Sequence, residues 1–324
     1  MKVVLSGDGG DEALGGYSRY KHDLKEDSLR NLLPSWLRRS LLAALAQLWP
    51  RTDWLPRPLR WKSALTNLSL DSEAAYANTL TLCRQPGRSR LLSADLLSEL
   101  RGHDSQRIAR ESFSRLGQAG KPDLLSGMIA ADMATLLPDD YLVKVDRASM
   151  AHGLEVRPPL LDHEFLELCA RLPSRWKIRD GETKWLLREL SRDVLPESIR
   201  NRPKQGFEVP LDDWFRGPLR AMFADLVLSR NSAVADFIDP REARRLFDAH
   251  QRGTARHGTV LWMLLSLAAW AERYLSASDE GVGSTIFRNW PTTVPQTAER
   301  PIGQFRKIVD PTPHSMTIHG GQPS

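Results

Sequence analysis

The chain opens with a short apolar run that ends in a glycine-rich turn. Residues 2–5 are followed at once by residues 6–12, which read SGDGGDE. A run of four residues predicts a strand buried on both faces, as in a parallel sheet. The glycines allow a sharp turn, and Asp11 and Glu12 suit the cap and first turn of a helix. The pattern predicts a strand–turn–helix unit, the edge at which open α/β sheets bind ligands.

Most of the remaining pattern has the period of a helix. Apolar positions recur every three or four residues between capping residues and prolines. Helices are expected from Pro34–Ser35 to the residues before Pro50, near 71–82, 93–100 and 104–116, over 124–137, 182–192 and 257–274, and from Asp239 onward. The proline-rich residues 50–60 predict an ordered connection. The expected fold is α/β, with a partial parallel sheet and a predominantly helical remainder.

Composition changes abruptly near the C-terminus. After Leu275 the chain is rich in Ser, Thr, Pro and Gly and has little periodicity. Such segments bury too little apolar surface to offset the entropy of ordering. We therefore expect one domain over residues 1–275 and a disordered or loosely attached tail over residues 276–324.

The overall composition indicates a soluble, cytoplasmic protein. The 324 residues are 41% hydrophobic and 26% charged, with a net charge of +5 from scattered arginines, so neither a nucleic-acid partner nor a membrane partner is indicated. The two cysteines lack metal-ligand spacing and favour a reducing compartment. The start of the chain does not resemble a leader peptide, and the apolar run 260–270 is too short to span a bilayer.

The glycine-rich turn carries the first candidate chemistry. Three carboxylates (Asp8, Asp11 and Glu12) would repel phosphates unless a cation lay between them. That combination points to magnesium carrying a nucleotide or pyrophosphate. The structural alternative is a strand–helix turn with acidic capping. The turn has neither the spacing of a dinucleotide fingerprint nor the G-K-[ST] sequence of a Walker loop.

Two later segments add polar residues to the candidate site. Residues 137–162 read LPDDYLVKVDRASMAHGLEVRPPLLD, a pattern that fits either a solvated helix face with an Asp140–Lys144 pair or the wall of a polar pocket. Residues 181–188 read GETKWLLR, and the turn at Asp180-Gly181 places Lys184 in the first turn of a helix. A lysine there adds a mobile cation to backbone donors suited to phosphate, although it could equally be solvated surface.

These three segments, in this order, resemble the asparagine synthetase family of the glutamine-hydrolysing, class B type. The first is similar to a family signature that continues through Gly15-Gly16-Tyr17. The second is similar to the long block that lines the ATP and acceptor site, and the third to the phosphate-binding lysine segment. Residues 200–207 also resemble a family segment. The resemblance covers roughly residues 1–275 and implies a nucleotide-binding sheet of the adenine nucleotide alpha hydrolase type.

The resemblance implies a reaction and a role for each matched residue. ATP would adenylate the carboxylate of aspartate, pyrophosphate would leave, and ammonia derived from glutamine would attack the acyl adenylate. Lys184 would stabilise the departing pyrophosphate, Asp11 would hold magnesium, and Asp8 would guide or deprotonate ammonia, with a side chain one methylene shorter than the family's usual glutamate. The expected nucleotide-binding residues are Ser6, Gly7, Gly9, Gly10 and Lys184.

One family motif does not occur in this sequence. The family has an S-G-G-x-D-S pyrophosphate loop before the first segment, and an N-terminal glutaminase domain with a catalytic cysteine. Neither is found in the 324 residues. We therefore expect the C-terminal part of a synthetase that needs a partner bearing the loop or the glutaminase domain. The alternatives are an amidotransferase acting on another carboxylate acceptor, and a non-catalytic partner that completes another chain's sheet.

Overall fold

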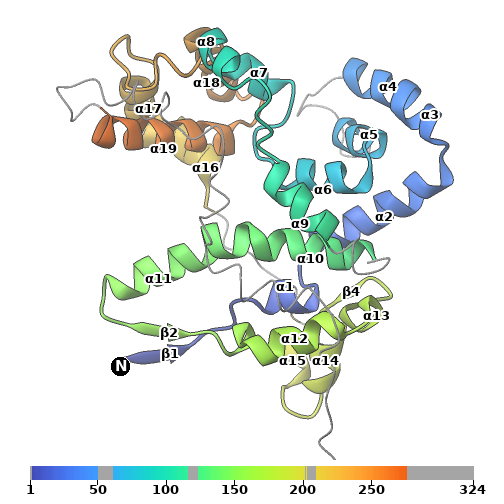
Figure 1. Ribbon diagram of the computed structural model, residues 1–324. Helices are drawn as coiled ribbons and strands as arrows, with labels where there is room; N and C mark the ends of the chain where they lie inside the picture. Colours follow the sequence, from blue (N-terminus) through green and yellow to red (C-terminus); the bar gives the residue numbers. More distant parts are fainter. Residues whose placement is uncertain (1, 50–60, 116–122, 201, 203–208, 276–324) are drawn as a thin grey trace, which may run out of the picture. The chain divides into compact units, whose positions relative to one another are not determined.

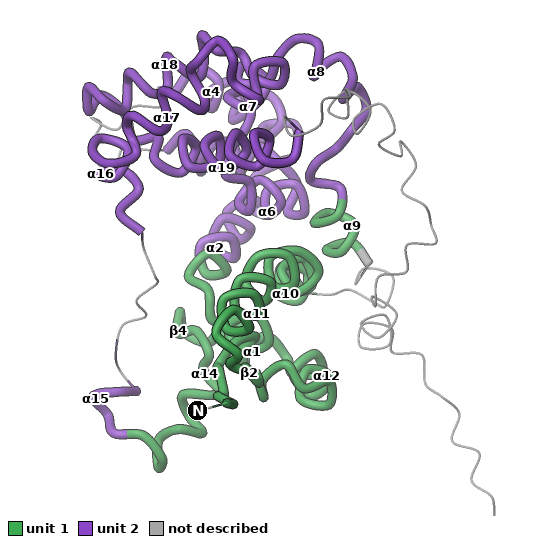
Figure 2. Tube along the Cα trace, turned by 90° about the vertical axis from the view of Figure 1, so that its left-hand side faces the viewer, with its two compact units in different colours: residues 1–21, 108–195, 294–324 green, residues 22–107, 196–293 purple. Residues whose placement is uncertain are grey.

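The chain forms two compact units, each described here by itself. The computed structural model describes residues 2–49, 61–115, 123–200, 202 and 209–275 (Figure 1). Unit 1 takes its described residues from 1–21 and 108–195, and unit 2 takes its own from 22–107 and 196–293 (Figure 2). Two predictions of local order, the connection over 50–60 and the tail over 276–324, lie outside the described residues, as does most of 200–207.

The predicted N-terminal strand is confirmed, but it is not buried on both faces. Strand β1 (Val3–Leu5) pairs in parallel with β2 (Glu155–Arg157), with Val4 opposite Val156. The side chains of Val3 and Leu5 are 40% and 69% exposed. Burial on both faces needs neighbouring strands and covering helices. Among the described residues β2 is the only strand that pairs with β1, which explains the exposure.

Unit 1 is built from short helices around this sheet. A small apolar cluster of Ala13, Leu14, Leu166 and Cys169 joins the first helix to the helix that follows Asp162. The elements of unit 1 after β1 are α1 (Gly10–Leu14), the start of α2 (Ser18–Leu32), most of α9 (Arg107–Arg115), α10 (Leu124–Ala134), η4 (Leu137–Leu142), α11 (Val143–Met150), β2, η5 (Pro159–Leu161), α12 (His163–Arg171), α13 (Ser174–Lys177), β3 (Ile178–Arg179), β4 (Glu182–Thr183) and α14 (Trp185–Leu190).

The helix expected to stop before Pro138 instead gives way to a second helical segment. Helix α10 ends at Ala134, and the π-helical η4 then carries Pro138 among its first residues and leads into α11. Proline lacks an N–H, and the first N–H groups of a helical segment have no intrahelical partner. A proline at the start of a segment is therefore tolerated, and the chain stays helical beyond it.

The turn predicted at Asp180-Gly181 is confirmed, but it joins two strands. Asp180 and Gly181 have φ values of 51° and 79°, and they connect the antiparallel pair β3 and β4. Two successive positive φ angles are typical of the two-residue hairpin turn that Asp-Gly favours. The segment that was expected to begin a helix at Glu182 is therefore strand, and helix α14 begins only at Trp185.

Unit 2 is helical in its described residues, and the helix starts expected at Asp239 and Ser93 are confirmed. The Asp239 side chain accepts hydrogen bonds from the backbone N–H groups of Arg241 and Glu242, and Ser93 caps α8 through Leu96. The elements of unit 2 are the rest of α2, α3 (Ser35–Leu37), η1 (Arg38–Leu42), α4 (Ala43–Leu48), α5 (Lys62–Ser69), α6 (Ser72–Leu80), α7 (Gly87–Leu91), α8 (Ala94–Glu99), α15 (Glu197–Arg200), α16 (Leu211–Arg216), α17 (Leu219–Val227), α18 (Pro240–Gln251) and α19 (Gly258–Tyr274).

The main core of unit 2 lies between helices α16, α17, α18 and α19. Phe223 and Phe247 stack with ring centroids 4.9 Å apart, and Phe215 meets Phe223 edge to face at 5.7 Å. Four positions predicted to face inward on the last helix are buried there: Leu261, Leu264, Leu265 and Ala268. Such aromatic pairs contribute about 0.5–1.5 kcal/mol beyond the area they bury. This core joins helices α16 to α19 and contains no residue of the candidate site.

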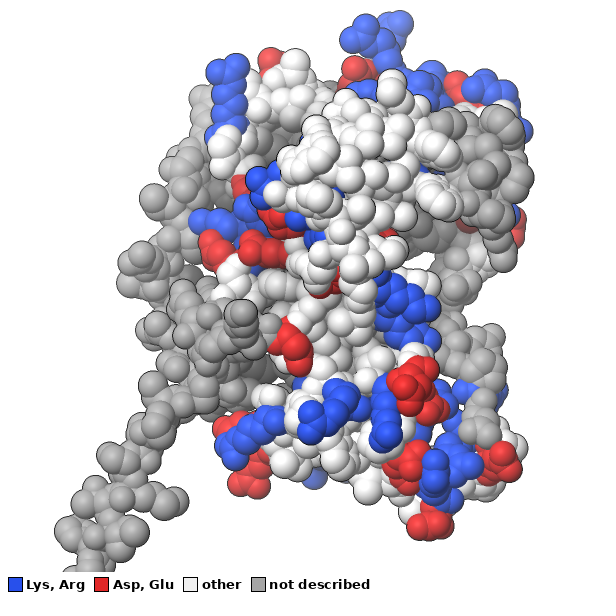
Figure 3. Space-filling model, turned by 90° about the vertical axis from the view of Figure 1, so that its right-hand side faces the viewer, with Lys and Arg blue, Asp and Glu red and all other residues white. Residues whose placement is uncertain are grey.

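The surface carries charges of both signs. On the face shown in Figure 3, lysine and arginine side chains are interspersed with aspartate and glutamate rather than gathered in one block. This agrees with the scattered arginines of the sequence. Within the described residues, no helix combines the length and apolar character needed to cross a bilayer.

Candidate functional site

The end of β1 brings the first two signature segments together. Strand β2 lies inside the second segment, so its pairing with β1 places residues 158–161 beside the glycine-rich turn. A Cβ atom on Gly9, whose φ is 82°, would collide with the Leu161 side chain. A Cβ on Gly10 would lie 2.7 Å from Leu160 Cδ1 and 3.7 Å from Lys184 Nζ. These two glycines therefore permit contacts that a larger residue would block.

The third segment contributes Lys184, which meets Asp11. Lys184 Nζ lies 3.0 Å from Asp11 Oδ1, and the two side chains are 28% and 26% exposed. A Cβ on Gly16 would collide with both Asp11 Oδ1 and Lys184 Cε. The ion pair thus lies across Gly16, and the glycine is needed for it. The structure brings together one carboxylate and one cation from segments more than 150 residues apart in the sequence.

The backbone of Lys184 differs from the prediction. Lys184 was expected in the first turn of a helix, but it is the residue before α14 and has φ 54° and ψ 34°. Left-handed conformations are uncommon for lysine, and such strained residues cluster at ligand sites and active sites. The β3–β4 hairpin and the start of α14 hold the residue from both sides. Its side chain is directed to Asp11 by this backbone rather than by a helix N-terminus.

Asp8 sits in the turn itself and is only partly buried. The Ser6 hydroxyl donates a hydrogen bond of 2.8 Å to Asp8 Oδ2. A Cβ on Gly7 would meet no atom within 4 Å, so the turn is open beside Asp8. The described contacts of Asp8 do not include Lys184. The structure places Asp8 and Asp11 in one turn but gives them different partners.

Unlike Asp8 and Asp11, which are partly exposed, Glu12 is buried in the protein. It is 2% exposed and accepts a hydrogen bond of 2.5 Å from the Tyr17 hydroxyl. Burial raises the pKa of Glu12, and the nearby charges of Asp11 and Asp132 add to the effect. Successive helix residues are rotated by about 100°, so Glu12 turns into the protein where Asp11 faces outward. The expectation of three carboxylates facing the ligand is wrong for this residue.

Glu12 gives a pH-dependent prediction. Because its folded pKa is raised, its contribution to stability is complete below the unfolded value near 4.5 and is lost as pH rises through the folded pKa. Glu12→Gln keeps an acceptor for Tyr17 and cannot ionise. We expect the melting temperature of the variant, relative to the native chain, to rise by about 2 °C or more between pH 4.5 and pH 7.5.

Thermal unfolding at three pH values measures this difference, with the exposed Glu99→Gln as the matched control. A difference that stays constant with pH, or that shrinks as pH rises, would contradict the assignment.

The described residues offer one part of a magnesium shell. No group of three or more His, Cys, Asp or Glu side chains within the described ranges could hold a metal ion. Magnesium commonly uses one or two carboxylates together with substrate phosphates and water. Asp11 would supply one such carboxylate, because its side chain is 26% exposed, and the ion would take the place that Lys184 Nζ has beside Oδ1. The donor set fits a magnesium ion that arrives with a nucleotide.

The second segment reaches the glycine-rich turn through its backbone and two leucine side chains more than through its charged side chains. Asp139, Asp140 and Lys144 are exposed on η4 and α11. The predicted Asp140–Lys144 pair is not formed, and Lys144 Nζ instead lies 5.2 Å from the centroid of the Tyr141 ring. This segment meets the glycine-rich turn through Arg157 O, which accepts from Ser6 N, and through the side chains of Leu160 and Leu161.

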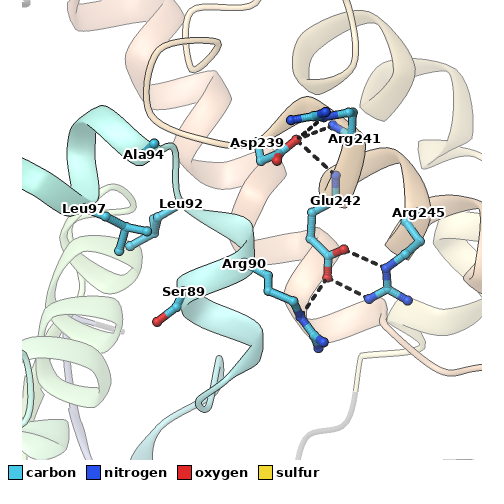
Figure 4. A pocket seen from close by; sticks show the side chains of 9 residues that line it. All are labelled: Ser89, Arg90, Leu92, Ala94, Leu97, Asp239, Arg241, Glu242 and Arg245. Carbon is cyan, nitrogen blue, oxygen red and sulfur yellow. Dashed lines mark hydrogen bonds and ion pairs between the residues drawn. The ribbon is translucent and has the colours of Figure 1, made fainter.

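Unit 2 contains a separate hollow of about 430 Å³ that three arginines line (Figure 4). Glu242 accepts two hydrogen bonds from Arg245, at 2.6 and 2.7 Å, and lies 3.7 Å from Arg90 Nε. The Arg245 hydrogen bonds are the main reason that the pKa of Glu242 is lowered. Asp239 caps α18 beside Arg241. These charged side chains pair with one another, and none of them belongs to the three signature segments.

Comparison with known proteins agrees with the three segments. The family model described as Asparagine synthase matches residues 1–272. A putative glutamine-hydrolyzing asparagine synthetase of Mycobacterium tuberculosis H37Rv is 33% identical over 274 residues, which cover 83% of this chain and 39% of that protein. Asparagine synthetase 1 of Bacillus subtilis is 25% identical over 272 residues, or 83% of this chain and 40% of that protein.

A mammalian relative matches a shorter stretch. The asparagine synthetase of Rattus norvegicus is 34% identical over 146 residues, which cover 40% of this chain and 26% of that protein. The chain thus spans about two fifths of the length of the bacterial relatives. No solved structure matched.

Proposed function

Because the chain belongs to the asparagine synthase family, we propose that it contributes the lysine and carboxylate side of an ATP-dependent amide ligase site, with aspartate as acceptor. The observation that carries the proposal is the Asp11–Lys184 pair across Gly16 at the end of β1. Acyl adenylation builds negative charge on the leaving phosphates, and fixed cations aimed at that charge lower the barrier.

In this proposal, Asp11 and Lys184 pair with each other while no nucleotide is bound. Lys184 turns from Asp11 to the departing pyrophosphate, and Asp11 would then hold a magnesium ion that arrives with the nucleotide. Such an ion neutralises charge on the phosphates as it builds. Ser6, Gly7, Gly9 and Gly10 let the backbone approach the nucleotide closely. As ammonia attacks the acyl adenylate and AMP leaves, Asp8, held by Ser6 at the open part of the turn, accepts a proton from the attacking nitrogen.

The edge of β1 that faces away from β2 supports the proposal of a partner polypeptide. Glu155 N donates to Lys2 O, and Ser6 N donates to Arg157 O. In a parallel ladder the alternate residues, Val3 and Leu5, therefore direct their N–H and C=O groups away from β2. Exposed edges of this kind accept a further strand. We propose that a polypeptide carrying the S-G-G-x-D-S loop pairs here and that ammonia reaches the site from glutamine through a glutaminase domain.

The same edge supports the second candidate, a non-catalytic chain that only completes another chain's sheet. Release of pyrophosphate from ATP separates the two. The chain is mixed with a loop-bearing polypeptide, ATP, magnesium and ammonia, with aspartate or with another carboxylic acid. Aspartate-dependent release supports the ligase, and release with a different acid identifies a different acceptor. A stable complex without release under all acceptors supports the non-catalytic role.

Lys184→Ala should affect chemistry far more than folding. The lost ion pair is more than a quarter exposed at each partner, and pairs of that kind contribute at most about 1 kcal/mol. The melting temperature should therefore change by no more than about 3 °C. Pyrophosphate release by the complemented chain should fall about a hundredfold or more. Retained activity together with a large loss of stability would show that Lys184 is structural.

A further inference from the structure

The helix that carries Asp11 is too short to fix its own position. Helix α1 has five residues, and its N-cap, Gly9, supplies no side-chain hydrogen bond. Helices of this length do not persist in water without tertiary anchors. Ala13 and Leu14 anchor one face in the apolar cluster of unit 1. Apolar contacts of this kind tolerate small rotations and slides, so they do not by themselves aim Asp11 at Lys184.

A polar anchor lies beside the apolar one. Glu12 is buried next to Asp11 in sequence, and its carboxylate accepts the 2.5 Å hydrogen bond from Tyr17. A directional hydrogen bond to a buried carboxylate restricts rotation about the helix axis more than apolar packing does. The orientation of Asp11 therefore depends on where Tyr17 is held.

Tyr17 is held by a second buried carboxylate, on α10. The Arg19 guanidinium lies 3.8 Å from the centroid of the Tyr17 ring, and the Tyr20 ring meets the Tyr17 ring edge-on at 5.5 Å. Asp132, which is 0% exposed, accepts from Arg19 Nη2 at 2.6 Å and from the Tyr20 hydroxyl at 2.5 Å. One carboxylate thus fixes two of the groups that contact the Tyr17 ring, and Tyr141 lies against the same ring with its centroid 6.3 Å away.

We infer that Asp132 and Tyr17 are positioning residues for the Asp11–Lys184 pair. Asp132 holds Arg19 and Tyr20, these hold the Tyr17 ring, and the Tyr17 hydroxyl holds Glu12 and with it α1. The importance of this network for catalysis rests on the proposed function. The contacts within the network do not depend on that proposal. Neither residue touches Lys184 in the described contacts, so an effect of either on Lys184 passes through α1 or through Gly16, which lies against both side chains of the pair.

The charges of the network fit this role. Asp132 has the Arg19 cation as a direct partner, whereas the side-chain partner described for Glu12 is the Tyr17 phenol. Burial raises the pKa of Glu12, and the neighbouring Asp11 and Asp132 carboxylates add to that rise. Removing the Tyr17 hydroxyl leaves that buried group without its described side-chain donor. It would then rotate toward water or another donor, and Asp11 would rotate with it.

The test observes Lys184 directly and needs no nucleotide. The full chain is labelled with lysine carrying ¹³C at Cε, and the Lys184 signal is assigned by its disappearance in Lys184→Arg. Asp11→Asn gives the displacement expected when the pair loses its charge. We expect Tyr17→Phe and Asp132→Asn each to move the Lys184 signal by at least half of that displacement. Tyr76→Phe, which removes a buried tyrosine hydroxyl in unit 2, is the matched control and should leave the signal in place.

Each outcome decides the inference. If the signal is unmoved in Tyr17→Phe and Asp132→Asn while their melting temperatures fall like that of Tyr76→Phe, the network is only structural and the inference is wrong. If Asp132→Asn does not fold, Arg19→Lys keeps the charge but loses the planar contact with Tyr17, and the same displacement is expected from it. Because the signal requires no turnover, a displaced Lys184 signal in these variants, together with a native chain that releases no pyrophosphate even with the loop-bearing polypeptide, rejects the proposed function alone. Normal activity with an unmoved signal rejects the positioning role alone.

Discussion

The 324-residue chain alone should show no aspartate-dependent release of pyrophosphate above background, and a polypeptide carrying the S-G-G-x-D-S loop should raise the rate at least a hundredfold. Asp11 supplies one carboxylate, whereas magnesium takes about six oxygen ligands. The described residues hold no cluster that could supply the rest of the protein's share. Loss of one well-placed donor commonly costs a hundredfold or more in rate, and the absent loop would supply several.

The matched control is a loop polypeptide in which the aspartate of S-G-G-x-D-S is replaced by alanine. It should still bind the chain, because backbone pairing along β1 does not involve that side chain, but it should not restore the rate. Binding is followed by size-exclusion chromatography, and pyrophosphate by a coupled assay. Aspartate-dependent turnover by the unaccompanied chain would refute the prediction, as would full rescue by the altered loop.

His250→Ala should destabilise unit 2 by about 3 kcal/mol. The His250 ring is 0% exposed, and its Nε2 lies 2.9 Å from Asp212 O while its Nδ1 accepts from His257 N at 3.1 Å. These bonds tie α18 to the start of α16 and the residue before α19. Alanine leaves both backbone groups without this partner and opens a cavity against Phe215. Unsatisfied buried polar groups cost about 1–3 kcal/mol each, and large-to-small substitutions in cores add a cavity cost.

Urea unfolding followed by tryptophan fluorescence measures this loss, because unit 2 contains Trp214, Trp262 and Trp270. His163→Ala is the matched control, since its side chain is 74% exposed and its change should stay within about 0.5 kcal/mol. The two units have separate apolar clusters, so the transition of unit 1 should not shift. A loss below about 1 kcal/mol for His250→Ala would show that the ring is replaceable.

The sequence predicts well those helices and turns whose ends are fixed by residues within a few positions. Asp239 and Ser93 cap their helices through their own side chains, so the residues that determine each helix start lie within a few positions of it. The Asp180-Gly181 turn is local in the same way. The conformation of the segment after a turn is determined less locally. Whether Glu182 continues as strand or helix depends on pairing with β3, and that pairing has no signal in the sequence around Lys184.

The sequence predicts the main residues of the candidate site, but only part of their arrangement in space. Asp11 and Lys184 were assigned to a common site by family resemblance, and the structure brings them together. Tyr17 was noted only as part of a motif, although a buried tyrosine hydroxyl next to a buried acid requires a partner. Asp132 lies within a plain apolar helix pattern, so its burial and its two donors could not be predicted without knowing what packs against α10.

The pairing of β1 with β2 has a consequence for synthesis on the ribosome. Val3 emerges first, but its partner Glu155 follows about 150 residues later. At about 5–20 residues per second, the strand waits roughly 8–30 s before its neighbour exists. During that interval the apolar strand lacks its β2 partner and is exposed to other nascent chains, and contacts this distant in sequence form slowly even afterwards. Ribosome-bound chains that stop before residue 155 should therefore be bound by holdase chaperones through residues 2–5, and chains extended beyond residue 195 should be released.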